Sequence, residues 1–90
     1  MGAAGHIIVE FFGVPRLLAG RAELAVTPGP LAEVLAAVER ACPRLQGLVE
    51  KGRLAPQYLL SLDGREFVTE LSRKLVSGTR LLLLSADAGG

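Results

Sequence analysis

Residues 77–85 read SGTRLLLLS and place four consecutive leucines directly after a Ser-Gly-Thr turn signal. A short apolar run that follows turn residues is typical of a strand. Because residues 81–84 do not alternate apolar with polar side chains, we expect burial on both faces, as in the centre of a sheet. The stretch therefore predicts a central last strand, around which the other elements are arranged.

A hairpin precedes this strand in the sequence. Residues 58–68 read YLLSLDGREFV, with Asp63-Gly64 between two apolar segments. Asp-Gly readily adopts the positive φ angles of a type I′ turn, which joins antiparallel strands tightly. We expect one strand over residues 58–62 and its partner over residues 65–68.

Two further strands are expected near the N-terminus. Residues 7–13 are rich in β-branched and aromatic side chains and are followed by Pro15. In residues 21–27, Ala22, Leu24 and Val26 occupy alternate positions, which is the period-two pattern of a half-buried strand. Together the two segments predict a hairpin with a long loop.

A helix is expected after residues 27–30, which read TPGP. Pro30 is suited to the first helical position, where its missing N–H would have had no partner. Pro43 limits the helix, because the residue before a proline avoids the helical region. Residues 44–52 are expected to hold one more short turn. The helix carries an apolar stripe with i, i+3, i+4, i+7 spacing, formed by Leu31, Val34, Leu35 and Val38.

The order of elements is strand, strand, helix, strand, short strand, strand. It predicts an α+β protein with a β-grasp (ubiquitin-like) fold, in which one main helix packs across one face of a mixed sheet of four to five strands. The last strand should lie beside the first, with a right-handed crossover. Ninety residues suit a single domain. We expect that domain to cover residues 1–90, with residues 86–90 as a flexible C-terminal Gly-Gly tail.

Composition argues against several classes of partner. The formal charge is +1 and there is no Trp, so neither a basic nucleic-acid surface nor a base-stacking platform is expected. The apolar runs are strand-sized, and Met1 to His6 lacks the features of a signal peptide, so no membrane association is expected. One cysteine cannot form an internal disulfide. We therefore expect a soluble cytoplasmic protein.

The first strand carries apolar residues toward both sides. Strand alternation directs Ile7, Val9 and Phe11 to one face and Ile8 and Phe12 to the other. If the helix covers one face, the other remains open and apolar, which is typical of a surface that binds a partner. The alternative is the ordinary scatter of exposed apolar residues.

Four segments together resemble one known family. Phe11-Phe12-Gly13 with RLLAG (16–20), the helix from residue 31 to Cys42-Pro43, LDGREFV (62–68) and residues 77–90 resemble MoaD/ThiS-type ubiquitin-like sulfur carriers. The likeness is strongest to the small subunit of molybdopterin synthase. Relatives often end in Pro-Pro-Val-Ala-Gly-Gly, whereas this sequence ends in SADAGG. The resemblance therefore specifies the class of carrier more firmly than the pathway.

The resemblance implies a reactive C-terminus. An E1-like adenylyltransferase (MoeB/ThiF-type) would adenylate the Gly90 carboxylate with ATP and magnesium, and a sulfurtransferase or other persulfide donor would convert it to a thiocarboxylate. A sulfur-accepting synthase large subunit (MoaE-type) would then receive the sulfur, in molybdenum cofactor biosynthesis. The chain itself would be a non-catalytic subunit that binds no cofactor. Asp87, Ala88 and Gly89 would enter the partner's active site, and Phe11 and Phe12 would contribute to partner binding.

Other functions remain open at this point. Related carriers serve cysteine synthesis, thiamine synthesis or tRNA thiolation. A ubiquitin-like modifier, joined to lysines through Gly90, is a second class, although Ala88 stands where ubiquitin-type tails commonly carry Arg. A third is a binding module in which the terminal glycines have no role.

Three other features of the sequence are weaker candidates for a site. Cys42 is the rival sulfur site, but a helix C-terminus disfavours a thiolate, so a packed thiol is the preferred interpretation. His6 has no second metal ligand nearby in sequence. Residues 47–53 resemble a phosphate-binding loop only faintly, because the Lys-Ser/Thr pair is missing.

Overall fold

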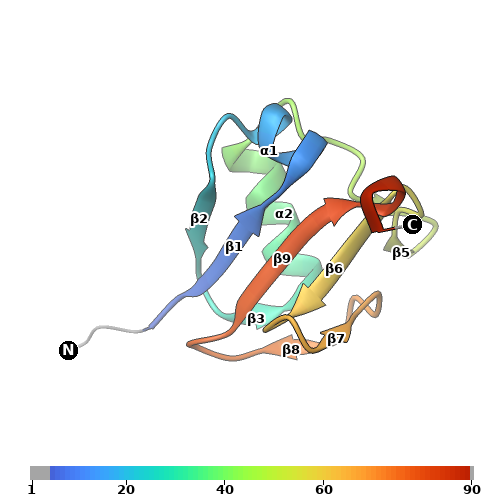
Figure 1. The fold of residues 1–90 in the computed structure, drawn as a ribbon. Coiled ribbons are helices and arrows are strands. Elements are labelled where there is room, and N and C mark those ends of the chain that lie inside the picture. The colour runs from blue at the N-terminus through green and yellow to red at the C-terminus, as the bar shows by residue number, and fades with distance from the viewer. Residues whose placement is uncertain (1–4, 90) are drawn as a thin grey trace.

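The fold was obtained as a computed structural model that describes residues 5–89 (Figure 1). Its helices are α1 (Gly13–Ala19), α2 (Leu31–Ala41) and the 3₁₀ turn η1 (Ala86–Gly89). The strands are β1 (Ile7–Phe11), β2 (Glu23–Val26), β3 (Gly29–Pro30), β4 (Val49–Glu50), β5 (Arg53–Leu54), β6 (Tyr58–Leu62), β7 (Glu66–Phe67), β8 (Lys74–Leu75) and β9 (Arg80–Ser85).

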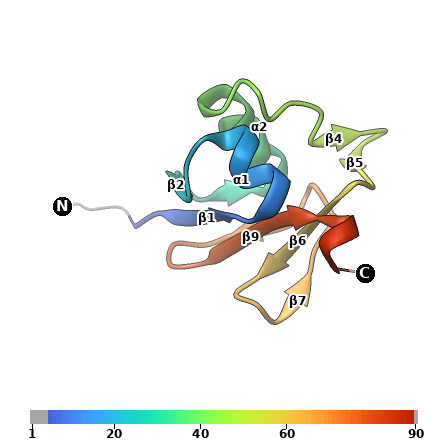
Figure 2. The ribbon, with the colours of Figure 1, turned by 45° about the horizontal axis from the view of Figure 1, so that its top comes forward.

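One mixed sheet organises the molecule. Within residues 5–89 it has five strands in the order β2-β1-β9-β6-β7, with β1 parallel to β9 and the other neighbours antiparallel. Two short ribbons, β3–β8 and β4–β5, accompany it. Both α-helices lie on the same side of the sheet, so the other face is left open (Figure 2). The predicted β-grasp fold, with the last strand central and beside the first, is confirmed.

Burial of β9 differs from the prediction on one face. Leu81 and Leu83 point toward the helices and are completely buried. Leu82 and Leu84 point to the open face and are only half-buried. The four leucines therefore have two roles: Leu81 and Leu83 fill the core, and Leu82 and Leu84 form part of a surface.

The Asp-Gly hairpin forms as predicted. Asp63 and Gly64 have φ angles of 53° and 71°, and the Arg65 N–H donates to the Leu62 carbonyl at 2.9 Å. Asp63 also fixes the start of β9, because its backbone N–H donates to the Arg80 carbonyl at 2.7 Å and its Oδ1 accepts from the Arg80 N–H at 2.8 Å. The returning strand is shorter than expected and covers only Glu66–Phe67.

Helix α2 buries the predicted stripe, but it begins one residue later than expected. Pro30 is the N-cap, with extended angles, and belongs to β3. The backbone N–H groups of Leu31 and Ala32 donate to the carbonyls of Arg73 and Leu71 at 2.8 and 3.0 Å, which replaces a side-chain cap. The core side chains of the stripe are Leu31, Val34, Leu35 and Val38, all at most 1% exposed.

Two regions expected to be irregular contain regular structure. The loop of the N-terminal hairpin holds α1, which ends at Gly20 with φ 72° and a 2.9 Å bond from the Gly20 N–H to the Arg16 carbonyl. A seven-residue helix has little intrinsic stability. Its buried Pro15 and the packing of Leu18 on the core stabilise it instead. Residues 44–52 contribute β4 rather than only a turn.

The core position of α2 leads to a stability prediction. We expect Leu35→Ala to lower the free energy of unfolding by roughly 2–5 kcal/mol, because it removes a buried side chain and leaves a cavity. Urea denaturation measures this loss. Arg40→Ala, on the exposed side of the same helix, is the control and should change stability little. An equal, small effect at both positions would contradict the burial of Leu35.

Candidate functional site

The open face of the sheet carries a band of apolar side chains. Cross-strand register places Leu84 opposite Leu59, and Leu82 opposite Ser61. Residues opposite one another share a face, so these side chains lie away from the helices. Phe12, at the end of β1, is 43% exposed. We define the open face by the apolar residues Ile8, Phe12, Leu59, Phe67, Leu82 and Leu84.

Phe11 and Phe12 point in opposite directions, as strand alternation predicts. Phe11 is 1% exposed and belongs to the core, whereas Phe12 is exposed on the open face. The Phe12 N–H donates to the Leu83 carbonyl at 3.0 Å and so extends the β1–β9 pairing. Of the two phenylalanines predicted to bind a partner, the structure leaves Phe12 accessible. Phe11 lies under the helices, because its place in β1 turns it inward.

The C-terminal segment emerges at the same end of the sheet as Phe12. Because β1 and β9 are parallel, the residues that follow both strands lie at one edge. After Ser85 the chain turns into η1, and the Ala86 N–H donates to the Gln57 carbonyl at 2.9 Å. Asp87 is exposed within this turn. Gly90 lies outside the described residues, and the flexibility expected for residues 86–90 stays a prediction.

The opposite end of the open face is charged. Arg80, which begins β9, contacts a carboxylate oxygen of Glu10 at 3.2 Å and one of Glu23 at 3.8 Å. The C-terminal segment follows the other end of this strand. The ion-pair cluster therefore lies toward the start of β9, where Ile8 is the neighbour of Arg80, whereas Phe12 and Leu84 lie next to the tail.

A cavity that the sequence did not predict lies beside the tail. It has a volume of about 420 Å³. Pro56 and Tyr58, which line it, flank the Gln57 that binds Ala86. Since β4 and β5 form one wall, no local pattern would have revealed it. Its lining is Glu50, Lys51, Arg53, Leu54, Ala55, Pro56, Tyr58, Leu59 and Thr69.

Cys42 is part of the core. It is 2% exposed at the C-cap of α2, and its N–H donates to the Val38 carbonyl at 2.8 Å. The preferred interpretation as a packed thiol is confirmed. Within residues 5–89, no group of three or more His, Cys, Asp or Glu residues is placed to hold a metal ion. No helix in the described part of the chain has the length and apolar character needed to cross a membrane.

Solved structures with the same fold include archaeal proteins. SAMP1 from Haloferax volcanii superposes with a TM-score of 0.78 at 22% identity, covering 96% of this chain and 100% of its own. Small archaeal modifier protein 1 from Methanosarcina acetivorans gives 0.76 at 22% identity, with 99% and 100% coverage. A Pyrococcus furiosus protein designated molybdopterin converting factor, subunit 1, gives 0.75 at 15% identity, with 91% and 98% coverage.

These likenesses establish the fold over nearly the whole chain. They also agree with the resemblance to MoaD/ThiS-type proteins. No protein-family model matches the sequence, and neither does any curated protein.

Proposed function

We propose that this β-grasp protein is a sulfur carrier of the MoaD/ThiS type, with the carboxylate of Gly90 as its reactive group. One observation carries the proposal. The parallel β1–β9 pairing sets the exposed Phe12 and the residues leading to Gly89-Gly90 at one end of the open face. A partner that binds the apolar end of this face therefore has the tail within reach.

Glycine suits the reactive position for a physical reason. It has no Cβ, so it adopts most backbone angles and allows another backbone to approach closely. A tail that ends in two glycines can enter a narrow active site, while the central strand β9 anchors it to the core. Asp87, exposed just before, is available to pair with a basic group of the partner. Such an exposed pair would contribute on the order of 0–1 kcal/mol.

The proposed chemistry takes place in partner active sites. An E1-like adenylyltransferase, which supplies the ATP and magnesium sites, joins the carboxylate to AMP and releases pyrophosphate. The terminal sulfur of a persulfide then attacks the carbonyl carbon, and AMP leaves. A second thiol cleaves the resulting acyl disulfide and releases the thiocarboxylate. The carrier contributes positioning of its carbonyl, and its buried Cys42 takes no part.

For the acceptor we propose the large subunit of a molybdopterin synthase, so that this chain is the small, non-catalytic subunit of the complex. The Pyrococcus furiosus neighbour designated molybdopterin converting factor supports this choice. Carriers for cysteine, thiamine or tRNA thiolation present the same kind of tail and remain the alternatives.

A second candidate function is protein modification. The archaeal neighbours from Haloferax volcanii and Methanosarcina acetivorans are named as SAMP1, and the second is described as a small archaeal modifier protein. In that role the activated Gly90 carbonyl would be attacked by a lysine amine instead of a sulfur nucleophile. The two functions share the adenylation step and differ only in the nucleophile that follows.

Intact mass spectrometry distinguishes these functions. The protein is incubated with an E1-like enzyme, ATP, magnesium and a persulfide donor. A carrier gains the mass difference between sulfur and oxygen, located at Gly90 by fragmentation. A modifier gives lysine conjugates when target proteins are present. An unchanged mass under both conditions would indicate a binding module and would overturn the proposal.

A further inference from the structure

Along one side of strand β2, the backbone groups have no partner strand in the described part of the chain. It is an edge of the five-stranded sheet, and no strand in residues 5–89 pairs with its outer side. The Phe11 N–H donates to the Ala22 carbonyl at 2.8 Å, so Ala22 faces β1. Because bonded and non-bonded pairs alternate in an antiparallel ladder, the backbone groups of Glu23 and Ala25, and the Thr27 N–H, point outward.

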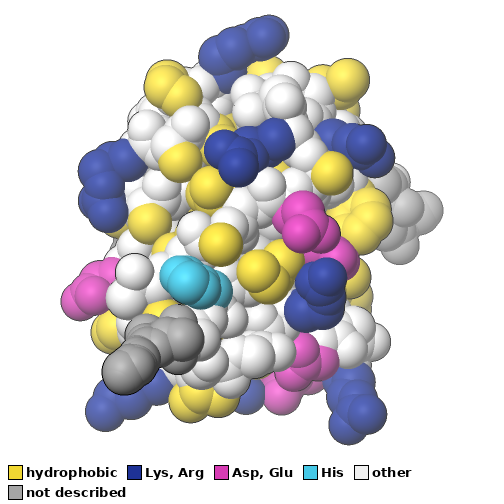
Figure 3. All heavy atoms as spheres, turned by 90° about the vertical axis from the view of Figure 1, so that its left-hand side faces the viewer, with side chains coloured by type: hydrophobic (Ala, Val, Ile, Leu, Met, Phe, Trp, Pro, Cys, Tyr) yellow, Lys and Arg dark blue, Asp and Glu magenta, His cyan; other side chains and the backbone are white. Residues whose placement is uncertain are grey.

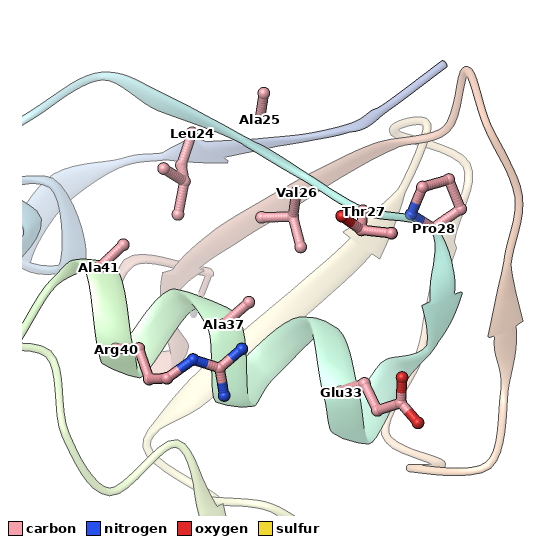
Figure 4. Close-up of a pocket in the computed structure, with 9 residues that line it drawn as sticks. All are labelled: Leu24, Ala25, Val26, Thr27, Pro28, Glu33, Ala37, Arg40 and Ala41. Carbon is pink, nitrogen blue, oxygen red and sulfur yellow. The ribbon is translucent and has the colours of Figure 1, made fainter. Parts of the chain in front are cut away.

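A groove lies between this edge and helix α2 (Figure 4). Leu24 and Val26 point toward the helix, where the groove is lined by Ala37 and Ala41. Alanines leave space that larger side chains would have filled, and the resulting cavity measures about 270 Å³. Pockets for small-molecule ligands usually measure about 300–1,000 Å³. The groove is therefore better matched to one or two side chains of a peptide.

Opposite charges mark the two ends of the groove. Arg40 comes from the helical turn below Leu24, with its guanidinium extending below Ala37, and Glu33 projects from the start of the helix, at the end nearer Pro28 (Figure 4). Neither side chain forms an ion pair within residues 5–89. Seven helical positions separate them by about 10 Å along the axis. An extended chain covers about 13 Å in four residues, and the two long side chains can span the difference.

We propose that the β2 edge and this groove bind an extended segment of a partner protein, which adds to the sheet as an antiparallel strand. Strand addition satisfies the outward backbone groups, and side chains at alternate positions supply specificity. The segment would carry a basic residue facing Glu33, a branched aliphatic residue opposite Val26 and over Ala37, and an acidic residue facing Arg40. These three occupy alternate positions, because alternate residues of a strand share one face.

This interface is separate from the proposed tail chemistry. In the sheet order, β1 lies between β2 and β9, so a strand added to β2 leaves the tail and the open face accessible. Viewed from the β2 side, the surface exposes hydrophobic side chains among both basic and acidic ones (Figure 3). A partner held at β2 would therefore remain bound while the tail occupies another protein's active site.

The opposite edge of the sheet is less suited to strand addition. Strand β7 has two residues, Glu66–Phe67, and so offers few backbone groups. Arg73 donates two hydrogen bonds to the carboxylate oxygens of Glu66 at 3.3 and 3.1 Å, and this hydrogen bonding raises the pKa of Arg73.

On the β2 edge, one side chain has to move before a strand can be added, since Arg21 Nε donates to the outward Glu23 carbonyl at 2.9 Å. That bond is exposed and local, so a partner strand displaces it readily.

The test is an NMR titration of isotope-labelled full-length protein with the peptide acetyl-GKTITDG-amide. Its Lys, Ile and Asp take the three alternate positions, and its threonines direct their N–H groups at β2. We expect shift changes at the Ala25, Thr27 and Ala37 amides and slower hydrogen exchange at Ala25. The same peptide N-methylated at both threonines should not bind, because it lacks the donors for the ladder.

Variants separate the groove from the strand edge. Ala37→Leu fills the groove and should weaken peptide binding at least about tenfold, since it excludes the isoleucine side chain. Ala32→Leu is the matched control, because Ala32 is exposed and does not line the cavity. Arg40→Glu should weaken binding roughly two- to fivefold. A peptide with Lys in place of Asp should restore the affinity of that variant.

Four results would overturn the proposal. They are equal binding of the N-methylated peptide, shift changes centred on Ile8 and Leu82 of the open face, self-association through β2 that excludes the peptide, and no binding at millimolar peptide. The proposed sulfur chemistry is tested independently, because thiocarboxylate formation should be unchanged in Ala37→Leu.

Discussion

Removing Gly89 and Gly90, or adding one residue after Gly90, is expected to abolish formation of the thiocarboxylate. Either change moves the electrophilic carbonyl away from the position where ATP and then the persulfide must meet it. Misplacement by about an ångström can already cost on the order of a hundredfold in rate. Intact mass after incubation with the E1-like enzyme, ATP, magnesium and persulfide donor measures the yield.

Two controls accompany this experiment. The tail variants should melt at the parent's temperature, because the removed residues follow β9 and the Ala86–Gln57 hydrogen bond is retained. Cys42→Ser should keep full sulfur transfer if it folds, since the proposed route never uses that buried thiol. Sulfur on the shortened or extended chain, or its loss in folded Cys42→Ser, would place the reactive centre on a different residue.

Local sequence signals predicted the elements whose structure depends on local chemistry. Asp63-Gly64 fixes its hairpin because both residues tolerate positive φ angles. The stripe of α2 identifies a buried helical face because its spacing matches the helical repeat. The directions of Phe11 and Phe12 follow from alternation along a single strand.

Elements that depend on distant contacts were not predictable in this way. Helix α1 is short and is held by packing of Pro15 and Leu18 rather than by its own propensity. The N-terminus of α2 is capped by the carbonyls of Arg73 and Leu71, about forty positions away in the sequence. The order of residues contains no local sign of such pairings.

The same distinction between local signals and distant contacts applies to the candidate site. The Gly-Gly pair and the apolar first strand are visible in the sequence, so the tail, Phe11 and Phe12 were predicted as candidates. The prediction was wrong for Phe11, which is buried in the core. The shared position of the tail and Phe12 depends on the parallel β1–β9 pairing, which follows from topology. The cavity beside Gln57 and the groove beside Ala37 each require two elements to be placed in space. A sequence pattern can therefore propose candidate residues, but it does not reveal the surfaces that surround them.

The same substitution at two adjacent positions should separate stability from partner binding. Phe11→Ala is expected to lower the free energy of unfolding by about 3–5 kcal/mol, because it empties a fully buried site. That is a large part of the roughly 5–15 kcal/mol that holds a domain folded. Phe12→Ala should change stability by only about 0.5 kcal/mol, since its side chain is exposed. Urea denaturation compares the two.

Binding to the E1-like enzyme should show the reverse order among folded proteins. An exposed aromatic side chain at the centre of an interface commonly contributes about 2 kcal/mol or more, so Phe12→Ala should weaken binding roughly 30-fold or more. Phe67→Ala is the matched control, because Phe67 is 69% exposed on the same face but lies on the edge strand β7, away from the tail. Calorimetric titration measures both affinities. Equal losses of affinity at the two positions would mean that the partner contacts the whole open face. Unchanged affinity in both variants would exclude that face as the docking surface. Only a selective loss at Phe12 supports a partner that binds beside the emerging tail.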